Sequence, residues 1–378
     1  MDKERDNSGD FLDRVGPDIS ASIFRTFDHP ADLLRASLVK RSWRRFVVEN
    51  DFCRKLCERL FPEAAIFAAA VEVSRSAPLS PRSSPSPDSP ESSGDVESRA
   101  AQAEFRIYSN LLRALVSTRR SVDCILHCIG ASSTDNFPDE TIENTLEPQD
   151  RINLRPSYSS GGQDEDGVTE TLTYRLSSDI CIVHEIRIQP FEAYFPRMVR
   201  FRMGHCKLPC ESESFVTDED KDEDENQEDI ADENYVWTYT SPEFPVLQES
   251  SLQTFKLQRP VLCIGGVVKI ELLGVQRQAT DDRYYICVCH AQVVGRSLSP
   301  VLMVDISDSG SRLVLKYLPA ARGMRGMRSK ALMQDNTLEW LEWARRTRYN
   351  QTRRLATMNL LLGPVQINEL DNIIGGGV

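Results

Sequence analysis

The sequence predicts an α+β protein of several parts, in which a small helical domain precedes an antiparallel β-sandwich. Three observations predict this class. Apolar residues between 10 and 62 recur with a helical period, whereas those between 125 and 295 alternate with a period of two. Between the two regions, residues 73–99 are dominated by Ser and Pro. The length of 378 residues allows more than one hydrophobic core.

The helical period begins near the N-terminus. Ile19, Ile23 and Phe27 form the first apolar stripe, and the turn at residues 28–30 ends it because Pro removes a hydrogen-bond donor. Further short helical runs cover residues 33–38, 39–47 and 52–60. So small a core leaves apolar surface either for a partner or for the rest of the same chain, and the pattern alone does not decide between the two.

Residues 10–62 resemble an F-box in four spaced motifs: GPDI at 16–19, IF at 23–24, DLLR at 32–35 and VKRSWR at 39–44. The resemblance implies a helical F-box domain that binds a Skp-type adaptor, and through it a cullin, in a ubiquitin ligase. It also implies the adaptor-facing residues, which are Pro17, Ile19, Ile23, Leu33, Leu34, Val39 and Trp43.

Residues 73–99 are predicted to be a disordered linker, since they hold too few large apolar side chains to offset the entropy of ordering. Four serines precede a Pro and are candidates for proline-directed phosphorylation: Ser80, Ser84, Ser86 and Ser89. Each phosphate would add roughly −1.5 to −2 charges. A plain spacer has the same composition. We expect the linker to make the F-box a mobile handle.

Short strands separated by Pro, Gly and Ser predict an antiparallel sandwich over residues 100–300, with a helix at its start over 101–115. Alternation places Ile180, Ile182, His184, Ile186 and Ile188 on one strand face. We interpret His184 as a structural histidine, with a role as ligand or pH switch as the alternative.

The same region resembles the opening of a galactose-binding-like, discoidin-type jelly roll in its motifs SS at 132–133, PD at 138–139 and SYSS at 157–160. The resemblance implies a sandwich whose loops at one end bind a ligand. Those loops have no fixed motif in the family, so no sugar or calcium ligand is implied. A lectin-like receptor for glycans or glycoproteins is therefore an alternative function.

Charge is concentrated in one segment. The net charge is −12, and residues 211–233, with 13 Asp or Glu and one Lys, account for all of it. Because like charges repel, this run is predicted to be a solvated, disordered insert between two strands of the sandwich. It lacks the central Gly of an EF-hand loop, which argues against calcium binding.

Residues 301–378 are predicted to form a C-terminal extension, with strands at 301–306 and 313–318 and a basic helix that begins near Leu338. Residues 312–354 hold 11 Lys or Arg against three Asp or Glu. We favour a helix that packs on the sandwich through Trp340 and Trp343. The alternative is a surface for nucleic acid, which would make the chain a nuclear nucleic-acid-associated protein.

The sequence contains no motif that indicates an enzyme. It lacks GxSxG, P-loop and HExxH motifs, and its ten Cys form no paired CxxC motifs. We therefore expect no catalytic residue, no cofactor and no metal site. No apolar run is long enough for a membrane span, and no signal sequence is evident, so we expect a nuclear or cytoplasmic protein with reduced thiols.

Together these features favour one function, that of the substrate-recognition subunit of a ubiquitin ligase. The F-box would bind the adaptor, and the sandwich would bind a target protein that the sequence does not identify. No membrane partner is expected, and nucleic acid is not the favoured partner.

Overall fold

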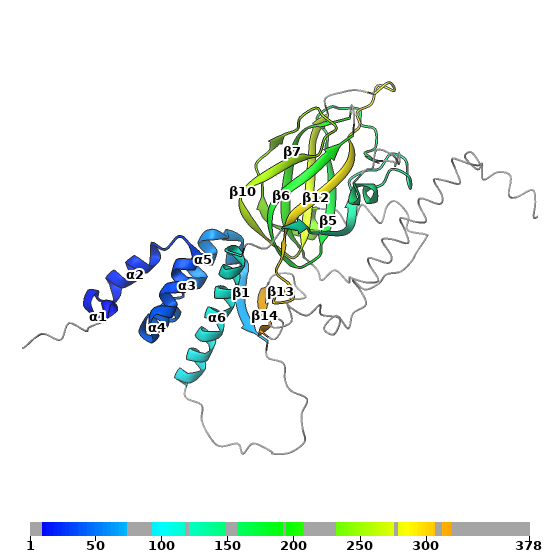
Figure 1. The fold of residues 1–378 in the computed structure, drawn as a ribbon. Helices are drawn as coiled ribbons and strands as arrows, with labels where there is room; N and C mark the ends of the chain where they lie inside the picture. The colour runs from blue at the N-terminus through cyan, green and yellow to red at the C-terminus, as the bar shows by residue number, and fades with distance from the viewer. Residues whose placement is uncertain are drawn as a thin grey trace, which may run out of the picture. The chain divides into compact units, whose positions relative to one another are not determined.

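A computed structural model describes residues 10–73, 93–117, 121–148, 157–191, 194–207, 232–275, 279–306 and 312–319. In this part of the chain the predicted α+β class is confirmed, since helices lead and β-sheets follow (Figure 1). Several predictions lie outside the described residues: the serines Ser80, Ser84, Ser86 and Ser89, residues 211–231 of the acidic insert, and the basic C-terminal helix.

Five short helices and a 3₁₀ turn form what we call the helical block. They are α1 (Phe11–Val15), α2 (Pro17–Arg25), α3 (Pro30–Val39), α4 (Arg41–Glu49), α5 (Phe52–Leu60) and η1 (Pro62–Ile66). Pro17 and Pro30 each begin a helix, where no amide donor is needed. His29 caps α3, because its Nδ1 accepts a hydrogen bond from the Ala31 amide at 3.2 Å. Asp51 has a left-handed backbone (φ 53°) that turns the chain from α4 into α5.

Phe24 lies at the centre of the helical block. Its side chain is 3% exposed, and its ring centroid lies 5.5 Å from Trp43, 5.4 Å from Phe46 and 5.6 Å from Phe52. Aromatic pairs at such distances contribute about 0.5–1.5 kcal/mol each beyond the area that they bury. One phenylalanine of α2 therefore holds α4 and α5 together.

Helix α6 (Ser93–Leu115) corrects the predicted linker, because residues 93–99 of the predicted 73–99 form its first turns. The Ser/Pro composition ends before this point, and the following residues are mostly good helix formers without Pro. The helix packs on α5 (Figure 1), and the ring of its Tyr108 lies 5.9 Å from the Arg54 guanidinium of α5. Tyr108 and Leu111 are both fully buried. The predicted helix over 101–115 is thus the C-terminal part of a longer one.

A three-stranded sheet joins distant parts of the chain. β1 (Phe67–Glu72) pairs in parallel with β14 (Leu313–Tyr317), and β14 pairs antiparallel with β13 (Leu302–Ile306). The two strands expected at the start of the C-terminal extension are therefore present. β1 was not predicted, because its sequence FAAAVE has no period-two alternation and its partner lies far along the chain.

Two antiparallel sheets form the sandwich. One has the strand order β10–β6–β12–β2, with β4 also paired to β12, and the other has the order β3–β5–β11–β7–β8, with β9 also paired to β7. The bounds are β2 (Val122–Asp123), β3 (Ile125–Ala131), β4 (Tyr158–Ser159), β5 (Thr169–Leu176), β6 (Ile180–Pro190), β7 (Pro196–Cys206), β8 (Tyr235–Thr240), β9 (Phe244–Pro245), β10 (Gln253–Ile264), β11 (Val267–Val275) and β12 (Cys287–Ser297), with 3₁₀ turns η2 (Ile142–Leu146) and η3 (Asp232–Asn234). Both sheets contribute to one core, which contains Tyr174, Phe201 and Val293.

Strand β6 changes faces in its middle, which corrects the single face predicted for it. Its pairing with β12 shifts by one residue, so that His184 has no residue opposite. Such a bulge inverts the side-chain alternation beyond it. Ile180 and Ile182 consequently lie in the core of the helical block, whereas Ile186 and Ile188 lie in the sandwich core. His184 itself is half-buried, and burial lowers its pKa.

The helical block and one end of the sandwich share a hydrophobic core, whereas we expected the F-box to move freely relative to the sandwich. Ile182 of β6 and Leu262 of β10 belong to the same buried cluster as Leu56 of α5 and Leu315 of β14. Both faces of β6 and β10 are therefore buried at this end, one against the sandwich core and the other against the helical block. Helix α6 and the small sheet continue the same core.

The sandwich thus has two ends of different character. The proximal end, where β6 begins and β10 ends, meets the helical block. At the opposite end, five groups of described loop residues form what we call the distal loops: 132–148, 161–168, 189–191 with 194–195, 246–252 and 279–286.

Candidate functional site

The helical block exposes two pairs of aliphatic side chains, which we call the aliphatic pairs. Ile19 and Ile23 lie one turn apart on α2 and are 57% and 37% exposed. Leu38 and Val39 end α3 and are 70% and 64% exposed. Apolar side chains of this size are mostly buried in folded proteins, so four exposed ones on a block this small indicate a protein-binding surface.

The seven predicted adaptor-facing residues separate into three groups. Four are exposed: Pro17, Ile19, Ile23 and Val39. Trp43 is half-buried. Leu33 and Leu34 are corrected, because they are 1% and 8% exposed and belong to the core of the helical block. Leu38, which was not among the predicted residues, is also exposed, beside Val39 at the end of α3.

Asp10 holds Trp43 in place. The indole Nε1 donates a hydrogen bond to Oδ1 of Asp10 at 2.8 Å, and the Ser42 hydroxyl donates to Oδ2 at 2.5 Å. These hydrogen bonds, from Ser42 first and Trp43 second, lower the pKa of Asp10 to about 2. The indole N–H is therefore already used within the block, and Trp43 has only its ring to offer to a partner.

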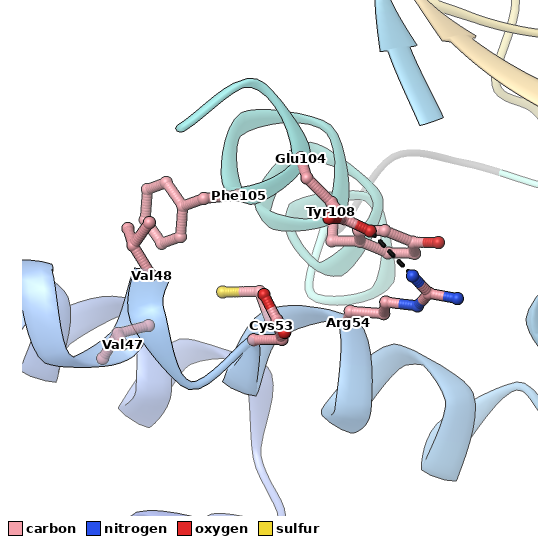
Figure 2. A pocket seen from close by; sticks show the side chains of 8 residues that line it. Val47, Val48, Cys53, Arg54, Glu104, Phe105 and Tyr108 are labelled. Carbon is pink, nitrogen blue, oxygen red and sulfur yellow. Dashed lines mark hydrogen bonds and ion pairs between the residues drawn. The ribbon is translucent and has the colours of Figure 1, made fainter. Parts of the chain in front are cut away.

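A small cleft lies where α6 meets the junction of α4 and α5. Its lining residues are Val47, Val48, Asp51, Cys53, Arg54, Glu104, Phe105 and Tyr108 (Figure 2). Arg54 pairs with Glu104 at 2.9 Å and lies 5.9 Å from the centroid of the Tyr108 ring. Burial raises the pKa of the Cys53 thiol to about 12, so no thiolate is available there. Because Arg54 and Glu104 are paired with each other across it, we interpret this cleft as the packing seam of α6.

The outer face of the second sheet carries a compensated charge network. Lys269 and Glu271 of β11 are 3% and 4% exposed. Glu271 accepts a hydrogen bond from Arg200 and forms an ion pair with Arg202, whose Nε lies 2.9 Å from Oε1. The Lys269 ammonium lies 2.7 Å from Asp232. Paired charges at low exposure are an arrangement that supports the fold, and we assign this network a structural role.

The serine motif that resembles a jelly-roll opening ties two distal loops together. The buried carboxylate of Glu170 accepts hydrogen bonds from the hydroxyls of Ser132 and Ser133, the latter at 2.8 Å, and from the Gln163 amide at 3.0 Å. The Gly161 amide donates to the Ser133 hydroxyl at 2.9 Å. The motif therefore positions loops 132–148 and 161–168 and is itself engaged in the fold.

The described residues hold no group of His, Cys, Asp and Glu side chains suited to a metal ion. The nine cysteines among them carry free thiols. In the same part of the chain, no helix has the length and apolar character that a membrane span requires.

No family model matches the chain. Among curated proteins it is similar to "F-box protein At4g00755" of Arabidopsis thaliana, with 42% identity over 319 residues that cover 82% of each chain.

Among solved structures it is similar to the family 32 carbohydrate-binding module of NanJ from C. perfringens, solved with galactose, with 12% identity, 46% of this chain and 99% of that chain covered, and a TM-score of 0.28. A fucolectin from striped bass serum matches with 13% identity, 48% and 50% coverage and a TM-score of 0.30. At these scores no argument about ligands follows.

Proposed function

The chain belongs to the F-box proteins, and we propose that it is the substrate-recognition subunit of a Skp–cullin–F-box ubiquitin ligase. In this role it performs no chemistry itself. The helical block binds a Skp-type adaptor and through it a cullin, and the sandwich binds the target protein. Holding the target and a charged ubiquitin-conjugating enzyme in one complex raises their effective concentration, to about the millimolar range for short connections.

The observation that carries the proposal is the exposure of the aliphatic pairs. Ile19 and Val39 come from two of the four motifs by which the sequence resembles an F-box, and both remain outside the core of the helical block. Burying an exposed aliphatic side chain of this size in an interface stabilises it by about 1.5–3 kcal/mol. The adaptor is the partner that the family membership supplies for this surface.

A second feature supports separate roles for the two parts, with adaptor binding by the helical block and target binding by the sandwich. The proximal end of the sandwich packs against the helical block, which leaves the distal loops as the end available for a target. The shared core also favours a fixed distance between the adaptor and the target, which suits transfer between two bound proteins. We place this activity in the nucleus or the cytoplasm, where the free thiols of the described cysteines remain reduced.

Capture of a purified Skp-type adaptor by the full-length chain tests the proposal. We expect Ile19→Asp/Val39→Asp to abolish capture, because a carboxylate in the interface would lose its hydration without a partner. Leu247→Asp/Val122→Asp is the matched control, since these sandwich side chains are 62% and 57% exposed. Circular dichroism should show that both variants remain folded. Equal capture by the wild type and Ile19→Asp/Val39→Asp would refute the proposal.

A further inference from the structure

The distal loops form one connected surface. The Gln189 side-chain amide donates to the Ser250 carbonyl at 3.2 Å, which joins the end of β6 to loop 246–252. The Phe191 amide donates to the Cys287 carbonyl at 3.0 Å, and Cys287 in turn pairs with Ser159 of β4. Ser159 donates its amide to the Glu140 carbonyl at 3.1 Å, so loop 132–148 is tied to the same strands.

Four large apolar side chains are exposed on these loops. Phe137 is 56% exposed, Leu247 is 62%, Leu252 is 43% and Phe191 is 39%. They come from three different loops, so they do not belong to one frayed segment. Exposed apolar groups gathered on one end of a domain are a usual sign of a binding surface.

Loop 246–252 is held rigid by one buried side chain. The amide of Gln253, which is 8% exposed, accepts a hydrogen bond from the Leu247 amide at 2.9 Å and donates to the carbonyls of Leu247 at 2.7 Å and Glu249 at 3.2 Å. Leu247 and Leu252 are therefore presented from a preorganised turn. Preorganised contact residues lose less entropy when a partner binds.

The apolar side chains are surrounded by negative charge. In the described distal loops the single basic residue is Arg283, whereas exposed acidic side chains occur in four of the loops: Asp135, Asp139, Glu143, Asp164, Glu165, Glu249, Asp281 and Asp282. Arg197, at the start of β7 beside the loops, is paired with Asp166 at 2.6 Å and does not offset this charge.

We infer that the distal loops bind a basic polypeptide segment that carries apolar anchor side chains, and that this is the class of target which the sandwich recognises. This inference rests on the proposed function, in which the sandwich binds a target protein, and it adds the chemical class of that target. The acidic side chains attract and orient Lys and Arg, while Phe137, Leu247 and Leu252 receive the apolar anchors. The same field repels polyanions, so nucleic acids, anionic membranes and phosphorylated peptides are disfavoured.

Fluorescence anisotropy with three labelled peptides tests the inference on the full-length chain. The first peptide alternates Lys and Leu, the second replaces each Lys by Glu, and the third replaces each Leu by Ser. We expect binding of the Lys/Leu peptide to weaken with added salt, and binding of the other two to be at least tenfold weaker. Equal or tighter binding of the Glu/Leu peptide would overturn the inference.

The acidic segment 211–233 also attracts basic peptides by its charge. Variants of the distal loops distinguish peptide binding at the loops from peptide binding at that segment. Asp135→Lys/Asp139→Lys should weaken binding of the Lys/Leu peptide roughly tenfold, because each reversal replaces an attraction by a repulsion. Leu247→Ser/Leu252→Ser should weaken it severalfold with no change in the salt dependence. The matched controls are Asp28→Lys/Glu49→Lys and Val122→Ser, at exposed sites elsewhere, which should bind as the wild type does.

Affinity that all these variants leave unchanged would overturn the inference, since the loops would then not be the site. Binding of phosphatidylserine vesicles or of galactose by the wild type, with no binding of the Lys/Leu peptide, would also overturn it in favour of a membrane or a sugar. Adaptor capture by the same samples keeps the two proposals apart. If the wild type captures the adaptor but does not bind the Lys/Leu peptide, only the proposed target chemistry is refuted. If the wild type does not capture the adaptor, the ligase role itself is refuted.

Discussion

Arg259 of β10 forms a two-point ion pair with Glu63 of η1, which lies 196 residues earlier in the chain. Nη2 of Arg259 lies 2.5 Å from Oε1 of Glu63, and Nη1 lies 3.1 Å from Oε2. The Glu63 side chain is 2% exposed, and the Arg259 side chain is 35% exposed and also lies over the Tyr239 ring. This pair is one of the polar contacts between the helical block and the sandwich.

Arg259→Ala should destabilise the protein by about 3 kcal/mol, because it leaves the Glu63 carboxylate buried without its partner. Replacing both residues by Leu should cost less than this single change, since no buried charge then remains. Urea unfolding measures both effects. The matched control is Arg197→Ala, which breaks the exposed pair with Asp166 and should cost at most about 1 kcal/mol. Equal losses in Arg259→Ala and Arg197→Ala would contradict the prediction.

A second contact across the same junction involves Arg296 of β12. Its Nη1 donates to the Ser117 carbonyl at 2.7 Å, and Nη2 donates to the Ala114 carbonyl at the end of α6. A cation at the C-terminus of a helix also interacts favourably with the helix dipole. Arg296→Met should therefore increase amide hydrogen exchange in the last turn of α6 more than in its middle, as measured by mass spectrometry. An equal increase in exchange along the whole of α6 in this variant would contradict the prediction.

Leu33→Ala should destabilise the chain by about 2–5 kcal/mol, because Leu33 is buried and its truncation leaves a cavity. Ile19→Ala is the control at an exposed site and should change stability by only about 0.5 kcal/mol. Thermal or urea unfolding distinguishes the two. As long as Leu33→Ala stays folded, adaptor capture should be weakened more by Ile19→Ala than by Leu33→Ala. A strong loss of adaptor capture by a folded Leu33→Ala variant would contradict this assignment and indicate that Leu33 contacts the adaptor.

The Asp10–Trp43 contact should depend on pH in a defined window. Because the folded-state pKa of Asp10 is lowered to about 2, its ionised form stabilises the fold above the unfolded pKa near 3.9, and this contribution is lost as the pH falls through about 2. The indole N–H resonance of Trp43 should therefore shift with a midpoint near pH 2. Asp10→Asn should remove that transition, and a midpoint near 4 in the wild type would contradict the assignment.

Gly265 should tolerate no side chain. Its φ is +88°, and a Cβ there would lie 2.0 Å from the Cβ of His205. Gly265→Ala should therefore destabilise the sandwich by about 1–3 kcal/mol. Gly167→Ala is the matched control, since nothing lies within 4 Å of a Cβ at that position. Comparable melting temperatures for the two variants would show that the turn relaxes more easily than its geometry indicates.

Local rules explain why the helical block and most strands could be predicted from the sequence. Pro17 and Pro30 mark helix starts through their own missing donors, and the alternation around Val268 and Ile270 reflects contacts within one strand pair. Each of these signals depends on neighbours a few residues away. Spacing likewise placed Ile19 and Ile23 on one apolar stripe, whereas their place at the adaptor was implied by the F-box resemblance.

Most of the misses depend on contacts between distant residues. Leu33 and Ile19 carry the same apolar signal, and only the packing of α3 against its neighbours buries one and leaves the other exposed. The bulge at His184 arises from the pairing of β6 with β12, so alternation along β6 alone did not reveal that its two halves serve different cores. The first turns of α6 were missed for a local reason, because residues 93–99 were counted with the Ser/Pro-rich segment that precedes them.

The sequence by itself determined the F-box family, the antiparallel strands and the concentration of acidic residues, because motif, period and charge are properties of short stretches. The tertiary structure alone decided that the helical block and the sandwich share a core, that Glu63 meets Arg259, and that acidic and apolar side chains from separate loops gather at the distal end. Those relationships come from chain closure over long distances, where burial and strand pairing select among residues that are locally equivalent.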